Sequence, residues 1–223
     1  MGGKGKRSLK HRGGPPKTEL EVLVEEESMA RLLRGNLRAW LGCGNEASIE
    51  VRPHRGKPDL LKKLPTLLQG YALLRRRGRD VRVLVLVDQD TDDCAALKRR
   101  LEDIARGAGP ATRQTARGGP FAVVNRSAVR ELENWYLGDW GAVRSAFPKV
   151  KADVPTEYRH NADKCDKETS DVFADVLRRN GVRNESKPDW AKRIGPHLSP
   201  EANRSPSFGA FLQGARSLLK EQS

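Results

Sequence analysis

The sequence lacks the residue patterns of disulfide-stabilised, zinc-binding and nucleotide-binding proteins. Its three cysteines are far apart and form no CxxC pair, which suits a reducing compartment and argues against a disulfide framework. The four histidines are scattered without zinc-ligand spacing. Because no Walker phosphate loop and no GxGxxG fingerprint occurs, ATP or NAD binding by this chain has no support. No Ser-His-Asp or Cys-His arrangement indicates nucleophilic catalysis.

Long apolar runs are missing as well. The longest, Val83–Val87, is far too short to cross a bilayer. The basic N-terminus is not followed by the apolar segment that a signal peptide requires. These absences predict a cytoplasmic protein.

Positive charge, by contrast, is abundant. Lys and Arg number 42 against 29 Asp and Glu, which gives a formal net charge of +13 and a pI near 10.0. Such a balance is typical of polyanion binding, although it also serves solubility alone. An anionic membrane surface is the main alternative partner, but no basic amphipathic helix with a large aromatic face supports it. We expect nucleic acid as the partner, DNA rather than RNA, and no membrane.

Residues 1–18 are predicted to form a disordered basic tail. They are rich in Gly, Pro, Lys and Arg and offer little to bury. Non-specific contacts with phosphates are one function for this tail, and a solvated tail without function is the alternative. The candidate nucleic-acid-binding residues there are Lys4, Lys6, Arg7, Lys10 and Arg12.

Strands and helices are predicted to alternate between residues 19 and 137. The hydrophobic patterns predict strands at 20–24, 48–51, 81–87 and 121–124, and helices at 29–41, 58–74, 93–106 and 128–137. This order predicts an α/β fold, a mostly parallel sheet flanked by helices. Ser28 is the predicted N-cap of the first helix, and Pro65 is predicted to kink or restart the second.

Residues 138–223 are predicted to form a helical C-terminal appendage packed on that core. No strand pattern is evident there, and helices are predicted at 169–179, 189–197 and 208–222. Trp135, Tyr136 and Trp140 are expected to cement the appendage, and stacking on bases is their alternative role.

Acidic residues stand at the predicted carboxyl ends of two strands. Glu25 ends the first strand, and Asp88 and Asp90 follow the third, two positions apart, so that both can face one site. Parallel α/β sheets bind ligands at these ends, and hard divalent cations prefer oxygen ligands. We therefore predict a site for Mg²⁺ or Mn²⁺ with these candidate ligands: Glu25, Asp88, Asp90, Asp92, Glu131 and Glu133.

Each acid also has a purely structural interpretation. An acid after a strand is ordinary turn chemistry, and Asp92 or Asp93 is the expected cap of the helix that follows. Glu131 can instead interact with a helix dipole from a first turn. A DxD motif alone is weak evidence; its combination with Glu25 at the end of the first strand is what favours a metal site.

Two stretches, Leu23-Val24-Glu25 and Val85-Leu86-Val87-Asp88-Gln89-Asp90, resemble the TOPRIM fold. That fold occurs in topoisomerases, primases, recombination proteins and the nucleases attached to overcoming-lysogenisation-defect ATPases. The chain is more closely similar to a bacterial family of unknown function, numbered four-two-seven-six in the domain-of-unknown-function series. The stretches that carry this second resemblance are Leu23–Ser28, Gly56–Pro65, Val87–Cys94, Arg130–Trp140 and Asn203–Phe208.

The TOPRIM resemblance implies a TOPRIM-like, Rossmann-like core and a role for each acid. Glu25 matches the TOPRIM glutamate, and Asp88 and Asp90 match the DxD motif that holds Mg²⁺ for phosphodiester cleavage or transfer. Glu133 is similar to the later acid with which the ATPase-linked nucleases hold a second metal. These four residues form the expected catalytic set. Glu26 stands where many TOPRIM proteins have a glycine after the glutamate.

The expected function is that of a metal-dependent nuclease. The resemblance further implies a separately encoded AAA- or ABC-type ATPase as partner and antiphage defence as the setting. Lys57 and Arg204 are further candidates for contacts with nucleic acid, although a lone lysine on a loop is usually only solvated; Ser207 is expected to cap the helix that follows. The alternative function is a non-catalytic subunit that binds nucleic acid or docks onto the ATPase, because fold does not imply function.

Overall fold

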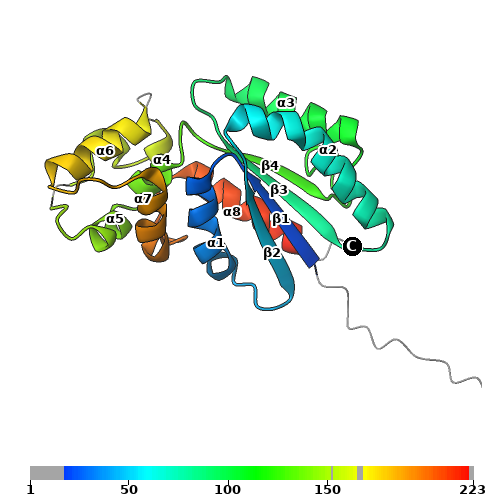
Figure 1. Cartoon of the computed structure of the whole chain (residues 1–223), viewed down its shortest axis with the longest axis horizontal. Coiled ribbons are helices and arrows are strands. Elements are labelled where there is room, and N and C mark those ends of the chain that lie inside the picture. The colour runs from blue at the N-terminus through cyan, green and yellow to red at the C-terminus, as the bar shows by residue number, and fades with distance from the viewer. Residues whose placement is uncertain (1–17, 152, 165–167, 221–223) are drawn as a thin grey trace, which may run out of the picture.

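The computed structural model describes residues 18–151, 153–164 and 168–220 (Figure 1). The basic candidates of the predicted tail, from Lys4 to Arg12, therefore lie outside the described residues. Thr18, the last residue of that predicted tail, already belongs to the first strand. Among the described residues, no helix combines the length and the apolar character that crossing a membrane requires.

Four parallel strands form one sheet in the order β2-β1-β3-β4. They are β1 (Thr18–Val24), β2 (Ala47–Pro53), β3 (Val81–Asp88) and β4 (Val123–Ala128). The predicted α/β class with a parallel sheet is confirmed. Because the strands are parallel, their carboxyl ends lie at the same edge of the sheet, where ligands bind in such folds.

Helices α2 (Lys57–Arg76) and α3 (Cys94–Ala108) cover one face of the sheet (Figure 1). The apolar run of β3 is buried on both sides, and on this face its Val83, Val85 and Val87 pack against leucines from both helices. Burial on both faces explains why this strand reads as a nearly continuous β-branched run.

Helices α1 (Glu27–Leu41) and α8 (Pro206–Leu219) cover the opposite face (Figure 1). Val22, Leu84 and Val124, one from each of three strands, are buried there. Helix α8 contacts β4, β3 and β1, although it is far from them in the sequence. The helix predicted at 208–222 as part of the appendage is therefore a layer of the sheet core.

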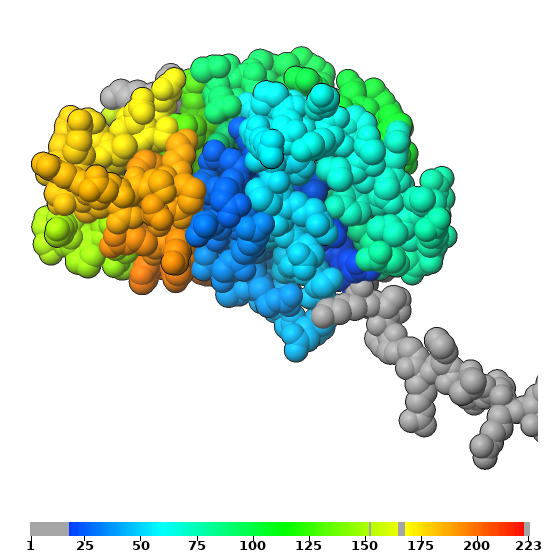
Figure 2. Space-filling model, viewed as in Figure 1, coloured from blue at the N-terminus to red at the C-terminus, as the bar shows by residue number. Residues whose placement is uncertain are grey.

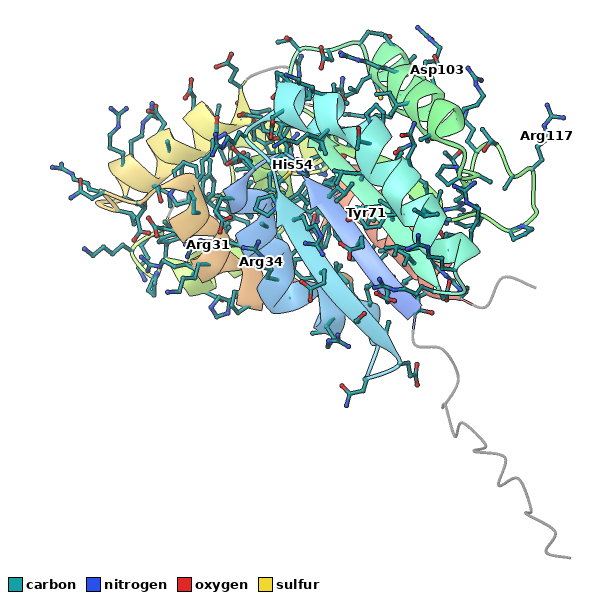
Figure 3. The ribbon with its side chains drawn as sticks, turned by 45° about the vertical axis from the view of Figure 1, so that its right-hand side comes forward. Arg31, Arg34, His54, Tyr71, Asp103 and Arg117 are labelled. Atoms are coloured by element: carbon teal, nitrogen blue, oxygen red, sulfur yellow. The ribbon has the colours of Figure 1, made fainter. Side chains whose placement is uncertain are left out.

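Arginines of α1 line the open edge of the sheet. Strand β2 is an edge strand that pairs only with β1. Its carbonyls at Val51 and Ala47 accept hydrogen bonds from Arg34 at 3.0 Å and Arg38 at 3.1 Å. Figure 3 shows Arg34 on α1 beside this strand. Charged side chains along an edge strand discourage another chain from adding a strand there.

Four helices gather beyond the carboxyl ends of the strands, at the left of Figure 1. They are α4 (Glu133–Gly138), α5 (Trp140–Ala146), α6 (Thr169–Arg179) and α7 (Lys187–Ile194). Short 3-10 turns complete this region at Thr156–Tyr158, Ala162–Lys164 and Gly195–His197. Helix α7 packs on α1, and the two lie side by side on the surface in Figure 2. The appendage is thereby joined to a helix of the core.

Aromatic side chains hold α4 in place. Trp135 and Tyr136 are fully buried, in agreement with the expectation that they cement the appendage. The ring of Trp135 lies 5.0 Å from that of Phe208 on α8, and the ring of Tyr136 lies 5.5 Å from that of Phe173 on α6. Because α4 is anchored on both sides, its first residue, Glu133, has a fixed position at the edge of the sheet.

The predicted N-cap of the first helix is wrong, and of the two outcomes predicted for Pro65 the restart is excluded. Glu26, and not Ser28, stands at the N-cap of α1, and the Ser28 hydroxyl donates a hydrogen bond to the Glu26 carboxylate. Helix α2 runs through Pro65 without a restart. The buried leucines Leu64 and Leu68 hold α2 on the sheet, which offsets the hydrogen bond that proline removes.

Two further boundaries differ from the predictions. Strand β4 continues to Ala128, which pairs with Asp88, so the helix predicted at 128–137 is replaced by a loop and the short α4. Ser205, and not Ser207, caps α8, and its hydroxyl accepts a hydrogen bond from the Phe208 amide. The pairing of β4 with β3 and the docking of the chain before α8 are tertiary contacts, which local patterns do not contain.

Candidate metal centre

The ends of β1 and β3 bring two of the predicted acids together. These strands are neighbours in the sheet, with Val24 opposite Leu86, so Glu25 and Asp88 meet at the carboxyl edge. The Asp88 amide donates a hydrogen bond of 3.1 Å to Glu25 Oε2. Asp88 is only 5% exposed, and its Oδ1 is buried without a hydrogen-bond partner. An unpartnered buried carboxylate oxygen is costly, which indicates that a proton or a cation belongs there.

Glu133 reaches the same edge from the start of α4. It is 1% exposed, and both of its carboxylate oxygens are buried without a hydrogen-bond partner. The ammonium of Lys187 on α7 lies 3.8 Å from Glu133 Oε1, beyond hydrogen-bond distance. Burial raises the pKa of Glu133 to about 7, against the attraction of Lys187.

Burial is the main cause of the raised pKa values of these acids, and their mutual repulsion adds to it. Burial raises the pKa of Asp88 well above its ordinary value, and the negative charges of Glu133, Glu25, Asp90 and Glu26 raise it further. Burial also raises the pKa of Glu25, against the hydrogen bond from the Asp88 amide. Crowded carboxylates of this kind require protons or a cation in compensation.

Two members of this cluster were missed in the sequence. The charge of Glu26 acts on Asp88, Glu133 and the hydroxyl of Tyr136. That hydroxyl is buried without a partner, and burial together with the nearby Glu133 and Asp88 raises its pKa. The signal in the sequence for Glu26 is its position directly after the strand-end glutamate. Tyr136 gave no signal beyond its membership of an aromatic run.

Asp90 and Asp92 lie on the outer side of the cluster, where Lys57 binds both. The Lys57 ammonium is 2.8 Å from Asp90 Oδ2 and 2.6 Å from Asp92 Oδ2, and it donates to the Gln89 carbonyl at 3.3 Å. Burial lowers the pKa of Lys57, but the hydrogen bonds to Asp90 and Asp92 outweigh it, so that the pKa is raised. Lys57 is thus a half-buried ion-pair partner of the DxD turn and not a solvated loop lysine.

The turn itself departs from the extended chain that the DxD spacing assumed. Asp90 has a positive φ of 53°, and its amide donates to the Arg130 carbonyl at 2.7 Å. Strain of this kind, in a residue other than glycine, is common at functional sites. Asp93 caps α3 by accepting a hydrogen bond of 2.7 Å from the Ala96 amide, which confirms that one of the two acids at 92–93 has this role.

Glu131, also predicted as a metal ligand, has its oxygens engaged elsewhere. Glu131 Oε2 accepts the Ser170 amide at 2.7 Å, and Oε1 accepts the Ser170 hydroxyl at 2.8 Å and Lys187 at 3.1 Å. Burial raises the pKa of Glu131, but these bonds outweigh it and lower the pKa. Glu131 therefore links α6 to α7 through hydrogen bonds. Of the two glutamates, Glu133 is the one whose carboxylate has no hydrogen-bond partner.

Arg204, a predicted contact for nucleic acid, lies on the loop before α8. Its guanidinium is exposed and donates to the Arg159 carbonyl at 2.8 Å. The loop docks onto α4, because Arg204 N donates to the Gly138 carbonyl at 2.9 Å and Asn203 Nδ2 donates to the Trp135 carbonyl at 2.8 Å. This docking gives the Asn203–Phe208 stretch a structural role.

The cluster fits a divalent cation in part. Within residues 18–151, 153–164 and 168–220, no three Asp, Glu, His or Cys side chains form a ready-made metal-binding group. Mg²⁺, however, is commonly held by one or two carboxylates together with waters and substrate phosphates. Asp88 Oδ1 and the two Glu133 oxygens are buried acceptors without partners, and this is the environment in which such an ion is stabilised.

The protein belongs to the class of α/β folds with one parallel sheet flanked by helices, and acids lie at the carboxyl edge of that sheet, where such folds bind ligands. The chain belongs to the family described as Domain of unknown function (DUF4276), whose model matches residues 24–215. This confirms the resemblance to that family of unknown function, and the match runs from the last residue of β1 into α8, so that it includes the other three strands and the helices beyond the sheet. No curated protein and no solved structure matched the chain.

Proposed function

We propose that this protein is a nuclease of TOPRIM-like fold that hydrolyses nucleic-acid phosphodiesters with Mg²⁺ or Mn²⁺. The observation that carries the proposal is the set of buried, unpartnered carboxylate oxygens on Asp88 and Glu133, beside Glu25, at the carboxyl edge of a parallel sheet. A fold maintains such a repulsive cluster at a cost in stability, and functional sites are where such costs are found.

Each acid has a distinct part in this proposal. Asp88 and Glu133 would hold the ion, with Glu25 fixed beside them by the Asp88 amide. A bound divalent ion supplies Lewis acidity for attack on a phosphodiester and stabilises the charge that develops. Lys187, at 3.8 Å from Glu133 and 3.1 Å from Glu131, would attract a phosphate oxygen of the substrate.

Exposed cations on the core helices support a polyanionic substrate. Helix α3 begins directly after the DxD turn and exposes Lys98, Arg99 and Arg100. The loop that follows α3 exposes Arg117, which points away from the core in Figure 3. Contacts of this kind neutralise phosphates without reading the base sequence and become weaker as the salt concentration rises.

A non-catalytic subunit that binds nucleic acid or docks onto an ATPase is the second candidate. It is favoured by the ion pairs of Lys57, which engage Asp90 and Asp92, and by the lack of a ready-made three-ligand group among the described residues. In this function the acids would serve the structure, and binding would be salt-sensitive without cleavage.

Cleavage assays distinguish these two functions. The purified protein is expected to cleave at least one of supercoiled plasmid, single-stranded DNA and RNA with Mg²⁺ or Mn²⁺, and we expect plasmid or single-stranded DNA to be the better substrate. Asp88→Asn should abolish cleavage, because it removes a buried carboxylate ligand, and Glu25→Gln should reduce it. Lys63→Gln is the control, since Lys63 only pairs with Asp59 on the surface of α2.

The nuclease proposal would be contradicted if the protein bound nucleic acid in a salt-sensitive way but did not cleave it, even after the cognate ATPase is added. Equal cleavage by wild type and Asp88→Asn would equally argue against this site, since the activity would then come from elsewhere or from a contaminant.

A further inference from the structure

Lys57 is held beside the DxD turn by the backbone around it. The amides of His54 and Gly56 donate to the Val24 and Glu25 carbonyls, both at 3.0 Å. Gly56 has a φ of 88°, which few other residues adopt, and the chain enters α2 immediately afterwards with Lys57. The end of β1 therefore positions the lysine that faces the end of β3.

All three N–H groups of the Lys57 ammonium have an acceptor. These are Asp90 Oδ2 at 2.8 Å, Asp92 Oδ2 at 2.6 Å and the Gln89 carbonyl at 3.3 Å. An ammonium is a compact point charge with three donors, so this arrangement resembles the way a small cation is coordinated. A lysine at the start of a helix opposes the helix dipole, and the two aspartates compensate for that position.

These four acids thus fall into two groups, which differ in their exposure and in whether a cation neutralises them. The outer acids, Asp90 and Asp92, are about half exposed and already share a cation. The inner acids, Asp88 and Glu133, are buried, and Asp88 Oδ1 and both Glu133 oxygens have no partner within the described residues. Only the inner group lacks a counter-charge at hydrogen-bond distance.

We infer that the site takes one divalent ion, at the inner acids, and that Lys57 takes the place of a second ion at the outer acids. This inference rests on the proposed function. A second dication beside Asp90 and Asp92 would have to displace the ammonium or approach it closely, and like charges at such distances repel strongly. Lys57 is accordingly a positioning residue that neutralises the DxD turn.

Calorimetric titration of the full chain with Mn²⁺ tests this inference without measuring activity. Wild type is expected to bind one ion, and Lys57→Gln is expected to bind two, because the outer acids then lack a counter-charge. Lys63→Gln, on the same helix and paired with Asp59 at 2.9 Å, should bind one ion. Adding Asp90→Asn and Asp92→Asn to Lys57→Gln should return the count to one.

Thermal unfolding gives a second readout. Without metal, Lys57→Gln should melt below wild type, and saturating Mn²⁺ should raise its melting temperature by more than it raises that of wild type. Two ions bound to wild type, or one bound to Lys57→Gln, would overturn the inference while leaving the metal-dependent function intact. No ion bound to wild type would overturn the inference and the metal-dependent function together.

Discussion

Replacing Glu133 with Gln is expected to stabilise the metal-free protein at pH 8 by roughly 3 kcal/mol. Burial raises the pKa of Glu133 from 4.5 to about 7, and one pKa unit corresponds to about 1.4 kcal/mol. The pKa of Glu133 is higher in the folded protein than in the unfolded chain. Its contribution to the free energy of unfolding is therefore fully present below pH 4.5 and is lost as the pH rises through 7. The glutamine amide has no proton to lose, so the variant should escape this loss.

Denaturant unfolding in the presence of a chelator measures the effect. Wild type should lose stability relative to Glu133→Gln between pH 4.5 and 7, and the two proteins should be about equally stable at pH 4.5 and below. The same variant should lose its affinity for Mn²⁺, because an amide is a poorer ligand than a carboxylate. Parallel stability curves for the two proteins would show that Glu133 is not a buried, unpartnered acid.

Glu131→Gln is the matched control. It lies two residues away, and its expected change in stability has the opposite sign. The oxygens of Glu131 accept hydrogen bonds from Ser170 and Lys187, and its pKa is lowered. An acid whose pKa is lower in the folded state contributes stability at pH values above its pKa in the unfolded chain. This contribution is lost as the pH falls through its pKa in the folded protein. The substitution should therefore destabilise the protein by about 1–3 kcal/mol at neutral pH.

Gly138→Ala is expected to destabilise the protein by roughly 1–3 kcal/mol, the usual cost of forcing extra atoms into a packed region. A Cβ at this position would lie 2.4 Å from Asn203 Oδ1 and 2.9 Å from the Ser205 amide nitrogen. The Ser205 backbone cannot move away without breaking the dock between the loop and α4. Thermal or denaturant unfolding measures the loss.

Gly209→Ala is the control for that variant. Gly209 lies inside α8, and a Cβ there would meet no atom within 4 Å. Alanine is favoured over glycine in a helix interior by about 0.5–1 kcal/mol, so this variant should be slightly more stable than wild type. Equal stability of Gly138→Ala and wild type would mean that the loop before α8 does not pack against Gly138 of α4.

The sheet could be predicted because its signals are local. The β-branched run of β3 and the alternating apolar residues of β1 are periodic within a few residues, and Glu25 and Asp88 follow directly after those strands. The convergence of Glu25 and Asp88 then followed from the parallel topology, since neighbouring strand ends share an edge. No contact outside these segments was needed for that step.

The other side of the site could not be predicted in this way. Which glutamate of the pair at 131 and 133 remains unpartnered depends on Ser170 and Lys187, which belong to α6 and α7. The engagement of Lys57 depends on a positive φ at Asp90, which the extended DxD pattern does not contain. Tyr136 joins the cluster because α4 is held between Phe208, which contacts Trp135, and Phe173, which contacts Tyr136 itself.

The position of α8 also has a consequence for synthesis of the chain. The ribosome releases the four strands long before it releases residues 206–219, and until then the sheet face formed by Val22, Leu84 and Val124 lacks the cover of α8. Transiently exposed apolar surface and open strands are prone to association with other chains. A messenger truncated before α8 should therefore yield a product that chaperones retain or proteases remove, even though every acid of the candidate site has already been translated.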